Sequence, residues 1–422
     1  MIQEKVKEIV VLGGGFGGVY SLIRLEKALR HVKNIRITLI SNENFFLYTP
    51  MLHEVATGGI ETRHIAYPIR KLLRKNRRFD FRLCHVRRVD LKNHRVFVNS
   101  GSLEYDYLVL ALGSTTNMSS LPGKSENVFT LKNLLDGVQI RNHIIRMFEN
   151  ADCETDPKRK KQLLTFVVVG PGYTGVQLVA DMRIFVMNYL LKKYPKIDPA
   201  LVRVMLIGDK GHILSGRDRK LAEASAKMLG KLGVEIRLNT QITRLWEHGM
   251  ELNHMEMEPT ETVIWAAGIV ANPVVGALEA EKDEIGRVKV DEYLRVPGYQ
   301  GVYALGDNAH FEDPVTGSVL PPRAHYAVRQ PKIIAANIMA DIKGTSPKRY
   351  RYQDAAELVS LGPRNAAMNL YGIHLSGVIA RFIWLAGYLA IMMGLYNRTR
   401  VLLDWILALI FDRDSTLLDV KR

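Results

Sequence analysis

The chain has 422 residues, with 47% hydrophobic and 24% charged side chains and a formal net charge of +15. The length favours two or three domains, and the composition excludes collagen-like and disordered proteins. The basic charge indicates anionic partners: nucleic acid, anionic lipid or phosphorylated cofactors. The two cysteines, Cys84 and Cys153, form no disulfide framework, and no signal-peptide pattern opens the chain, so we expect a cytoplasmic protein.

The first segment follows the order strand, glycine turn, helix, strand. An apolar run at 8–12 leads into GGGFGG at 13–18, and apolar side chains recur on one helical face over 19–29. Residues 34–40 (NIRITLI) alternate like a second strand. Parallel strands need a crossover helix, so this order predicts one βαβ unit.

The same order returns later in the chain. LLTFVVV at 163–169 precedes GPGYTG at 170–175, a predicted helix at 176–191 and a predicted strand at 201–207. The polar stretch between the two units, residues 151–162, is predicted to be an exposed connection. This internal duplication indicates two units of one architecture.

The glycine spacing in both turns predicts dinucleotide binding. GxGxxG provides a tight turn, a close approach to a pyrophosphate and close packing of helix on strand. Two copies, each between a strand and a helix, favour this interpretation over chance glycine turns. The glycines with this spacing are Gly13, Gly15 and Gly18, and Gly170, Gly172 and Gly175.

Three further apolar strands end in small-residue turns, at 107–113, 263–268 and 301–307. The third ends in Asp307, whose carboxylate could accept a hydrogen bond from a ribityl hydroxyl of a flavin. Alone, such an aspartate is more often a turn residue. In this context we assign it to a cofactor.

The end of the chain is apolar. Over 365–396 only Arg381 is formally charged, and a basic stretch at 397–400 precedes a second apolar run at 401–411. The longest uncharged stretch of the first run, 382–396, and the run at 401–411 are both shorter than the ~20 residues of a spanning helix. Two amphipathic helices lying in a membrane interface are therefore predicted. A buried helix pair in a dimer is the alternative, and a true span is less favoured.

These motifs together resemble the type II (non-proton-pumping) NADH:quinone oxidoreductases, two-dinucleotide-binding-domain flavoproteins. NFFLYTPMLHEVATG at 44–58 resembles the stretch of that family beside the flavin. Similar in order and spacing are LPG at 121–123, LKNL at 131–134, the Gly-Asp of 306–307, PPRA at 321–324 and the apolar end. The resemblance covers essentially the whole chain.

The implied fold is α/β, with two Rossmann-like domains like those of glutathione reductase and a C-terminal amphipathic helical region. It implies an FAD domain in two pieces, 1–120 and 290–345, around an NAD(P)H domain at 121–289. Residues 346–422 would anchor the protein to the cytoplasmic face of the cell membrane. The implied reaction is hydride transfer from NADH, or possibly NADPH, to FAD, followed by reduction of a respiratory-chain quinone.

The resemblance also implies the site residues. Gln177 and His325 are the expected catalytic residues, and no metal is expected. Around the quinone we expect His325, Tyr326, Arg329 and Gln330. The expected cofactor-binding residues are Gly13, Gly15, Phe16, Gly17, Gly18, Ser41, Glu43, Thr49, Val86, Ala111, Gly113, Gly306, Asp307 and Ala324 for FAD, and Gly170, Gly172, Tyr173, Thr174, Gly175, Asp209 and Gly268 for the nucleotide.

The chain departs from the family pattern where carboxylates are usual. Ser41 stands at the end of the second strand of the first unit, where most such units have an acidic residue for the ribose. Gly208 stands there in the second unit, followed by Asp209 and Lys210, which leaves NADH or NADPH open. Gln177 replaces a glutamate and cannot carry a proton at neutral pH.

The predicted quinone helix also departs from the family, because His325 and Arg329 replace glutamines. Proton delivery by His325 and stacking by Tyr326 are the functional interpretations, and packing roles are the alternatives. A disulfide reductase is disfavoured because the two cysteines form no CxxC or CxxxxC pair. The rival functions are a soluble NAD(P)H dehydrogenase with another acceptor, and a non-catalytic flavin-binding sensor or assembly protein. We expect a homodimer bound to anionic lipids and no nucleic-acid partner.

Overall fold

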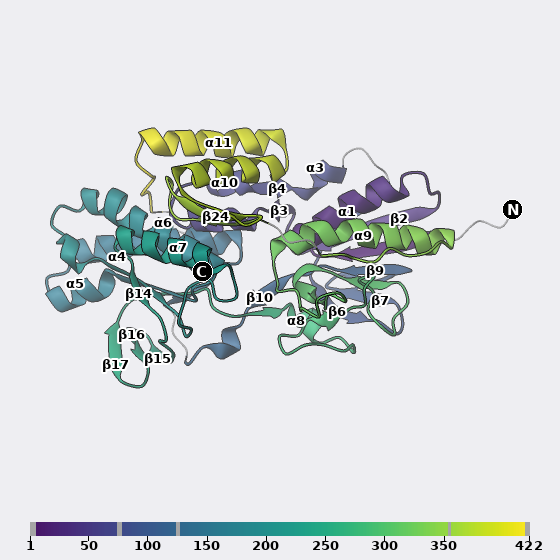
Figure 1. The fold of residues 1–422 in the computed structure, drawn as a ribbon, viewed down its shortest axis with the longest axis horizontal. Helices are drawn as coiled ribbons and strands as arrows, with labels where there is room; N and C mark the ends of the chain where they lie inside the picture. Colours follow the sequence, from purple (N-terminus) through teal and green to yellow (C-terminus); the bar gives the residue numbers. More distant parts are fainter. Residues whose placement is uncertain (1–5, 74–77, 124–126, 353–355, 418–422) are drawn as a thin grey trace. The chain divides into compact units, whose positions relative to one another are not determined.

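The computed structural model describes residues 6–73, 78–123, 127–352 and 356–417. Its contacts divide the chain into two compact units, each assembled from discontinuous segments (Figure 1). Unit 1 comprises Met1–Phe46, Tyr67–Thr115 and Ile269–Gln353; unit 2 comprises Leu47–Ala66, Thr116–Gly268 and Asp354–Arg422. These units are defined by contacts between residues, whereas the domains expected from the sequence were defined by the cofactor that each would bind. Which cofactor each part binds therefore stays a prediction.

Unit 1 is built on a five-stranded parallel sheet in the order β21-β9-β1-β2-β5. Its strands are β1 (Lys7–Leu12), β2 (Ile35–Ser41), β5 (Phe79–Leu83), β9 (Tyr107–Leu110) and β21 (Val302–Ala304). Helix α1 (Phe16–Leu29) is the crossover between β1 and β2 and packs on α9 (Ala324–Lys343). The strands that the sequence predicted at 8–12, 34–40, 107–113 and 301–307 are all present.

Smaller elements complete unit 1. The antiparallel sheet β6-β7-β8 lies between β5 and β9 in the chain. Pairs form between β10 and β19, between β20 and β22, and between β3 and β4. The bounds are β3 (Phe45–Leu47), β4 (Ala66–Pro68), α3 (Ile69–Leu73), β6 (Val86–Asp90), β7 (Arg95–Val98), β8 (Gly101–Glu104), β10 (Ser114–Thr116), β19 (Ile269–Ala271), α8 (Pro273–Gly276), β20 (Val288–Lys289) and β22 (Ala309–His310).

Unit 2 repeats the architecture with a parallel sheet in the order β11-β18-β12-β13-β14. An antiparallel sheet β15-β16-β17 precedes β18 in the chain. The bounds are α2 (Leu52–Val55), β11 (Val128–Phe129), α4 (Leu134–Cys153), α5 (Pro157–Leu163), β12 (Thr165–Val169), α6 (Tyr173–Ile184), β13 (Arg203–Ile207), α7 (Arg219–Leu232), β14 (Glu235–Arg237), β15 (Ile242–Trp246), β16 (Gly249–Leu252), β17 (Glu256–Pro259) and β18 (Thr262–Trp265). The predicted doubly wound architecture is therefore confirmed.

The segment 151–162 is largely exposed or half-buried, as expected, but it is not a loop. Most of it is helical, because α4 runs to Cys153 and α5 begins at Pro157. Asp156 caps α5 by accepting a bond from the Lys158 amide, and Pro157 suits a first helical position. The helix was not predicted because its residues are mostly charged and show no apolar periodicity.

The C-terminal part of unit 2 contains a three-stranded antiparallel sheet, β23 (Glu357–Ser360), β24 (Ala366–Leu370) and β25 (Ile373–Gly377). Helices α10 (Val378–Ile391) and α11 (Leu395–Ile410) follow. The basic residues at 397–400 lie in the first turns of α11. The chain turns earlier, at Gly394, whose φ of +78° suits glycine. Within the described ranges, every helix is too short or too polar to cross a bilayer.

Candidate functional site

The first glycine turn joins β1 to α1 and has no room for side chains at two positions. Gly13 has a φ of +107°, and a Cβ atom there would lie 2.2 Å from the carbonyl oxygen of Ala111. A Cβ atom on Gly18 would lie 1.7 Å from the carbonyl oxygen of Gly13. Both glycines are therefore required by the close approach of helix, turn and neighbouring strand.

The middle glycine of this turn is different. Gly15 is the N-cap of α1, with no side-chain cap, and a Cβ atom there would meet no heavy atom of the described residues within 4 Å. Phe16 and Gly17 begin the helix, and the Phe16 ring lies edge-on to Phe46 with centroids 4.9 Å apart. The first helical amides thus border open space.

The second glycine turn, between β12 and α6, repeats this geometry. Gly170 has a φ of +102°, and a Cβ atom on Gly175 would lie 2.0 Å from the Gly170 carbonyl oxygen. Gly172 is the N-cap residue of α6 and provides no side-chain hydrogen bond. A Cβ atom there would meet no heavy atom of the described residues within 4 Å. Tyr173 and Thr174 begin α6, and the Arg217 guanidinium lies 5.5 Å from the centroid of the Tyr173 ring.

Three other helices of unit 2 have a side-chain cap at the N-terminus. The side chains of Asn133, Asp156 and Asp218 accept bonds from the first-turn amides of α4, α5 and α7. Helices α1 and α6 begin with glycines and leave those amides to another acceptor. A phosphate at a helix N-terminus satisfies them and interacts favourably with the helix dipole. The two turns therefore fit two pyrophosphates.

The turn after β21 has the polar groups expected beside a flavin. Asp307 lies in a 3-10 turn that begins at Gly306, whose φ is +58°, and Oδ2 of Asp307 accepts a bond of 2.7 Å from the Ser114 hydroxyl. Asn308, which the sequence analysis missed, is fully buried and bonds both backbone polar groups of Gly113, at 3.1 and 2.6 Å. Two expected turns, at 113 and 306, are thus joined by one amide side chain.

The four residues expected around the quinone share α9 but have different surroundings. Gln330 is buried, and its Oε1 accepts a 2.7 Å bond from the Gly306 amide, which ties the helix to the Asp307 turn. Tyr326 is also buried, and its ring lies near those of His325 and Tyr352, with centroid distances of 5.3 and 5.5 Å. Arg329 is exposed.

The remaining expected cofactor residues fall in both units. In unit 1, Ser41 ends β2 and its Oγ accepts a bond from the Glu43 amide, Val86 opens β6, and Ala324 opens α9. In unit 2, Thr49 opens a 3-10 turn, Asp209 is exposed after β13, and Gly268, with a φ of +64°, follows β18. Gln177 is buried in α6, and its Nε2 has no hydrogen-bond partner among the residues that the structure describes.

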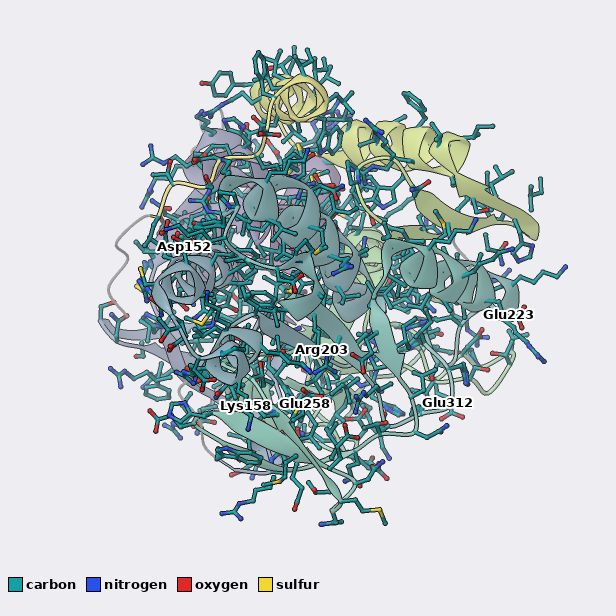
Figure 2. All side chains as sticks on the ribbon, turned by 90° about the vertical axis from the view of Figure 1, so that its left-hand side faces the viewer. Asp152, Lys158, Arg203, Glu223, Glu258 and Glu312 are labelled. Atoms are coloured by element: carbon teal, nitrogen blue, oxygen red, sulfur yellow. The ribbon has the colours of Figure 1, made fainter. Side chains whose placement is uncertain are left out.

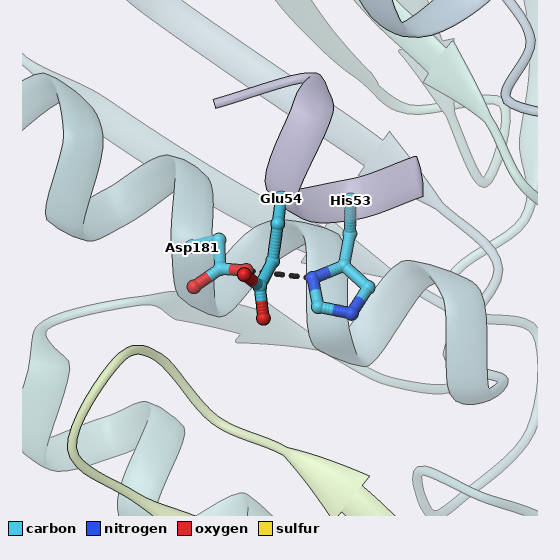
Figure 3. A group of neighbouring side chains, drawn as sticks. All are labelled: His53, Glu54 and Asp181. Carbon is cyan, nitrogen blue, oxygen red and sulfur yellow. Dashed lines mark hydrogen bonds and ion pairs between the residues drawn. The ribbon is translucent and has the colours of Figure 1, made fainter. Parts of the chain in front are cut away.

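A cluster of buried charges lies where α2 contacts α6. His53 and Glu54 of α2 converge on Asp181 of α6 (Figure 3), and His53 Nδ1 lies 2.6 Å from Asp181 Oδ2. Burial acts to raise the pKa of Asp181, but the hydrogen bond from His53 and the positive charges of His53, Arg413 and Arg381 lower it below its usual value. Asp181 is therefore an ionised carboxylate at neutral pH.

The ligand atoms of these three residues lie within 4.8 Å of one another, a spacing that a metal ion could use. Both oxygens of Glu54 are occupied, however: Oε1 accepts from Arg381 at 3.0 Å and Oε2 from Trp405 at 2.7 Å. A cation would have to displace a guanidinium, so we interpret the cluster as an ion-pair network. The sequence analysis missed it, although a lone arginine in an apolar run signals a buried partner.

The comparisons with known proteins agree with this geometry. The family model "Pyridine nucleotide-disulphide oxidoreductase" matches residues 7–331. The type II NADH:quinone oxidoreductase Ndh of Mycobacterium tuberculosis is 30% identical, over 97% of this chain and 89% of its own. A probable NADH dehydrogenase of Dictyostelium discoideum is 29% identical, over 97% of this chain and 90% of its own.

A solved structure supports the fold independently. The structure of NDH2 from Plasmodium falciparum in complex with NADH matches with a TM-score of 0.87, covering 98% of this chain and 100% of that one, at 18% identity. Both cysteines of the present chain, Cys84 and Cys153, are free. The chain thus belongs to the pyridine nucleotide-disulphide oxidoreductases and, within that family, to the type II NADH:quinone oxidoreductases, which use FAD.

Proposed function

We propose that this chain holds FAD at the first glycine turn and NADH at the second, and reduces a quinone taken from a membrane. The observation that carries the assignment is the pair of glycine-capped helix N-termini with open Cβ directions at Gly15 and Gly172. When bound, FAD accepts a hydride from the nicotinamide and passes two electrons to the quinone.

The residues proposed for FAD are those of unit 1 around the first turn, together with Thr49. Gly15 and the first amides of α1 hold the pyrophosphate, and Ser41 and Glu43 approach the ribose at the end of β2. Asp307 accepts hydrogen bonds from hydroxyl groups, and Ser114 orients its carboxylate through the 2.7 Å bond. Val86, Ala111, Gly113, Gly306 and Ala324 contribute backbone contacts.

The residues proposed for the nucleotide lie in unit 2. Gly172, Tyr173, Thr174 and Gly175 hold its pyrophosphate, with Arg217 beside Tyr173 as an additional positive charge. Asp209 contacts the ribose and favours NADH. Gln177 orients the reacting ring through its buried amide, whose Nε2 is available for a bond.

The acceptor side is assigned to the start of α9. Conversion of a quinone to a quinol consumes two electrons and two protons, so a group that delivers a proton is needed beside the hydride donor. His325 is the proposed donor and Arg329 an exposed charge near it. Tyr326 and Gln330 support the helix through ring packing and the bond to Gly306.

We also propose that α10 and α11 lie in the membrane interface. Their outward side chains are large and apolar: Ile379 and Phe382 are each 68% exposed, Leu395 is 75% exposed and Ile410 is 69% exposed. Large exposed apolar side chains on two successive helices are typical of a lipid or protein contact. The positive charge of the chain supports docking of the protein on anionic lipid at the cytoplasmic face of the cell membrane.

Steady-state kinetics test the reaction. Purified protein should be yellow, release FAD and oxidise NADH with a short-chain quinone, with a lower kcat/KM for NADPH. Flavin bleaching by NADH without turnover on the quinone would identify a flavin-binding sensor instead. Turnover with a soluble one-electron acceptor alone would identify another dehydrogenase.

A surface variant tests the membrane assignment. Changing Ile379, Phe382 and Ile410 together to serine should abolish sedimentation with anionic liposomes, because about 25 cal/mol of transfer free energy is lost per Å² of apolar contact. The flavin should stay bound, since these side chains point outward. If liposome binding persists and a dimer instead becomes monomeric, the apolar surface packs on a second copy.

A further inference from the structure

The two C-terminal helices share one buried carboxylate. Glu54 is 3% exposed, and its two oxygens accept bonds from different helices: Arg381 Nη2 of α10 at 3.0 Å and Trp405 Nε1 of α11 at 2.7 Å. The Arg381 guanidinium also donates to Ser360 Oγ at 2.7 Å and lies 4.4 Å from the centroid of the Trp384 ring. Glu54 is therefore the one carboxylate, among the described residues, that joins both helices.

Two further charged side chains of the C-terminal region bond the same early segment of the chain. Arg413 donates to the carbonyl and hydroxyl oxygens of Thr57, each at 3.0 Å. Asp404 of α11 accepts from His64 at 2.5 Å. Every one of these partners lies in the segment 47–66, which unit 2 contributes from an early part of the chain.

Because Glu54 is buried, the loss of its charge would leave Arg381 without a compensating charge. Removal of one member of a buried ion pair leaves the other member uncompensated in a medium of low dielectric. The neighbouring Asp181 is bonded to His53 at 2.6 Å and, among the described contacts, accepts no hydrogen bond from Arg381 or Trp405, which both donate to Glu54. Loss of the Glu54 charge should therefore displace Arg381, and with it α10.

We propose that Glu54 is a positioning residue of the quinone half-reaction: its carboxylate fixes the lipid-facing helices α10 and α11 to the segment that carries Thr49. The proposal rests on the proposed function, in which the quinone is taken from the membrane where these helices lie. Glu54 itself touches neither cofactor nor quinone in this proposal. Its effect is on the approach of the acceptor, so hydride transfer from NADH should not depend on it.

The test is Glu54→Gln, which keeps the side-chain volume and removes the charge. In stopped-flow experiments, reduction of the flavin by NADH should stay within about twofold of wild type. The KM for a short-chain quinone should rise about tenfold, the change expected when one buried hydrogen-bonding group is left poorly satisfied. Association with anionic liposomes should weaken in parallel.

Glu258→Gln is the matched control. Glu258 is 5% exposed and pairs with Arg203 at 2.6 Å within the sheet region of unit 2 (Figure 2). Its loss removes an ion pair whose carboxylate is similarly buried and that does not involve α10 or α11. We expect a lower thermal stability with an unchanged KM for the quinone.

Two further variants keep the proposal falsifiable. Trp405→Phe removes one donor to Glu54 while the apolar ring stays, and should raise the quinone KM by a smaller factor even if Glu54→Gln does not fold. Adding Arg381→Gln to Glu54→Gln removes the uncompensated charge and should recover part of the quinone KM.

The outcomes distinguish the positioning role of Glu54 from the proposed quinone reduction. If wild type reduces quinone but Glu54→Gln and Trp405→Phe both behave like Glu258→Gln, the positioning role is refuted and the proposed function stands. Equal losses of flavin reduction and quinone reduction would also refute it, because they indicate a general structural role. If wild type itself does not reduce quinone, both proposals fall.

Discussion

The glycine turns at 13–18 and 170–175 share their glycine spacing but differ in where a side chain lies between the turn and the next strand. In each, the first glycine has a positive φ, the last lies against the carbonyl of the first, and the middle one is open in its Cβ direction among the described residues. A Cβ atom on Gly14 would lie 2.4 Å from Ser41 Oγ, and one on Gly208 would lie 2.4 Å from Pro171 Cγ. Each turn thus has room for one side chain between its second residue and the end of the next strand.

The side chain that fills this gap comes from the strand end in the first unit and from the turn in the second. In the first turn the strand end provides Ser41 and the turn provides Gly14; in the second the turn provides Pro171 and the strand end provides Gly208. The missing carboxylate at the end of β13 has a steric cause, since Pro171 occupies its space. Asp209, the next residue, is exposed and becomes the candidate for the ribose.

The shared geometry predicts the largest effect. Gly18→Ala and Gly175→Ala would each place a Cβ atom within 2.0 Å of a backbone oxygen, at 1.7 and 2.0 Å. Each should destabilise its unit by at least about 3 kcal/mol, measured by denaturant unfolding, and Gly18→Ala should also prevent flavin retention. Wild-type stability in either variant would show that the turns relax more than their packing indicates.

The middle glycines should separate the two ligands. Gly15→Val and Gly172→Val have open space for the side chain, so folding should be preserved. We expect Gly15→Val to lose FAD, and Gly172→Val to keep FAD while its KM for NADH rises by about a hundredfold, near 2.7 kcal/mol of binding. Flavin absorbance and initial rates measure both. Loss of FAD from the Gly172 variant would reverse the assignment of the turns.

An exchange of side chains between the turns tests this steric difference. Gly208→Ser alone should cost about 1–3 kcal/mol of unfolding free energy, because its Cβ atom meets the Pro171 ring. Adding Pro171→Gly recreates the arrangement of Gly14 and Ser41 and should recover most of that loss. The comparison fails if the single variant melts at the wild-type temperature, or if the double variant is less stable than the single one.

The smallest effect concerns pH. The position of Asp181 in α6 corresponds to Arg24 in α1 when the turns are aligned, so only the second helix carries a buried carboxylate at this place. The native pKa of Asp181 is lowered from the usual 3.8, so its ionisation stabilises the fold above that pH and the stabilisation is lost as the pH falls below it. As Asp181 becomes protonated, wild type should lose at most about 1.4 kcal/mol of unfolding free energy per pH unit. Asp181→Asn should lack this loss. Parallel acid-unfolding curves for the two proteins would contradict this.

Local patterns were enough to predict most of the fold. Glycine spacing and strand hydrophobicity depend on neighbours in the chain, and the strands around both turns are where these patterns predicted them. Composition gave no helix signal in two places: the charged stretch at 151–162 contains α5, and the basic residues at 397–400 lie inside α11. Charged residues occur in helices as readily as in loops, so charge alone does not define a helix end.

The sequence by itself determined the duplicated βαβ architecture, the two glycine turns and the family, because each depends on residues close together in the chain. Only the tertiary structure decided which distant residues meet. Glu54 and Arg381 are 327 positions apart, and His53 and Asp181 are 128 apart. Only folding brings these groups together, and it also buries them, which converts a lone arginine in an apolar run into one half of an ion pair.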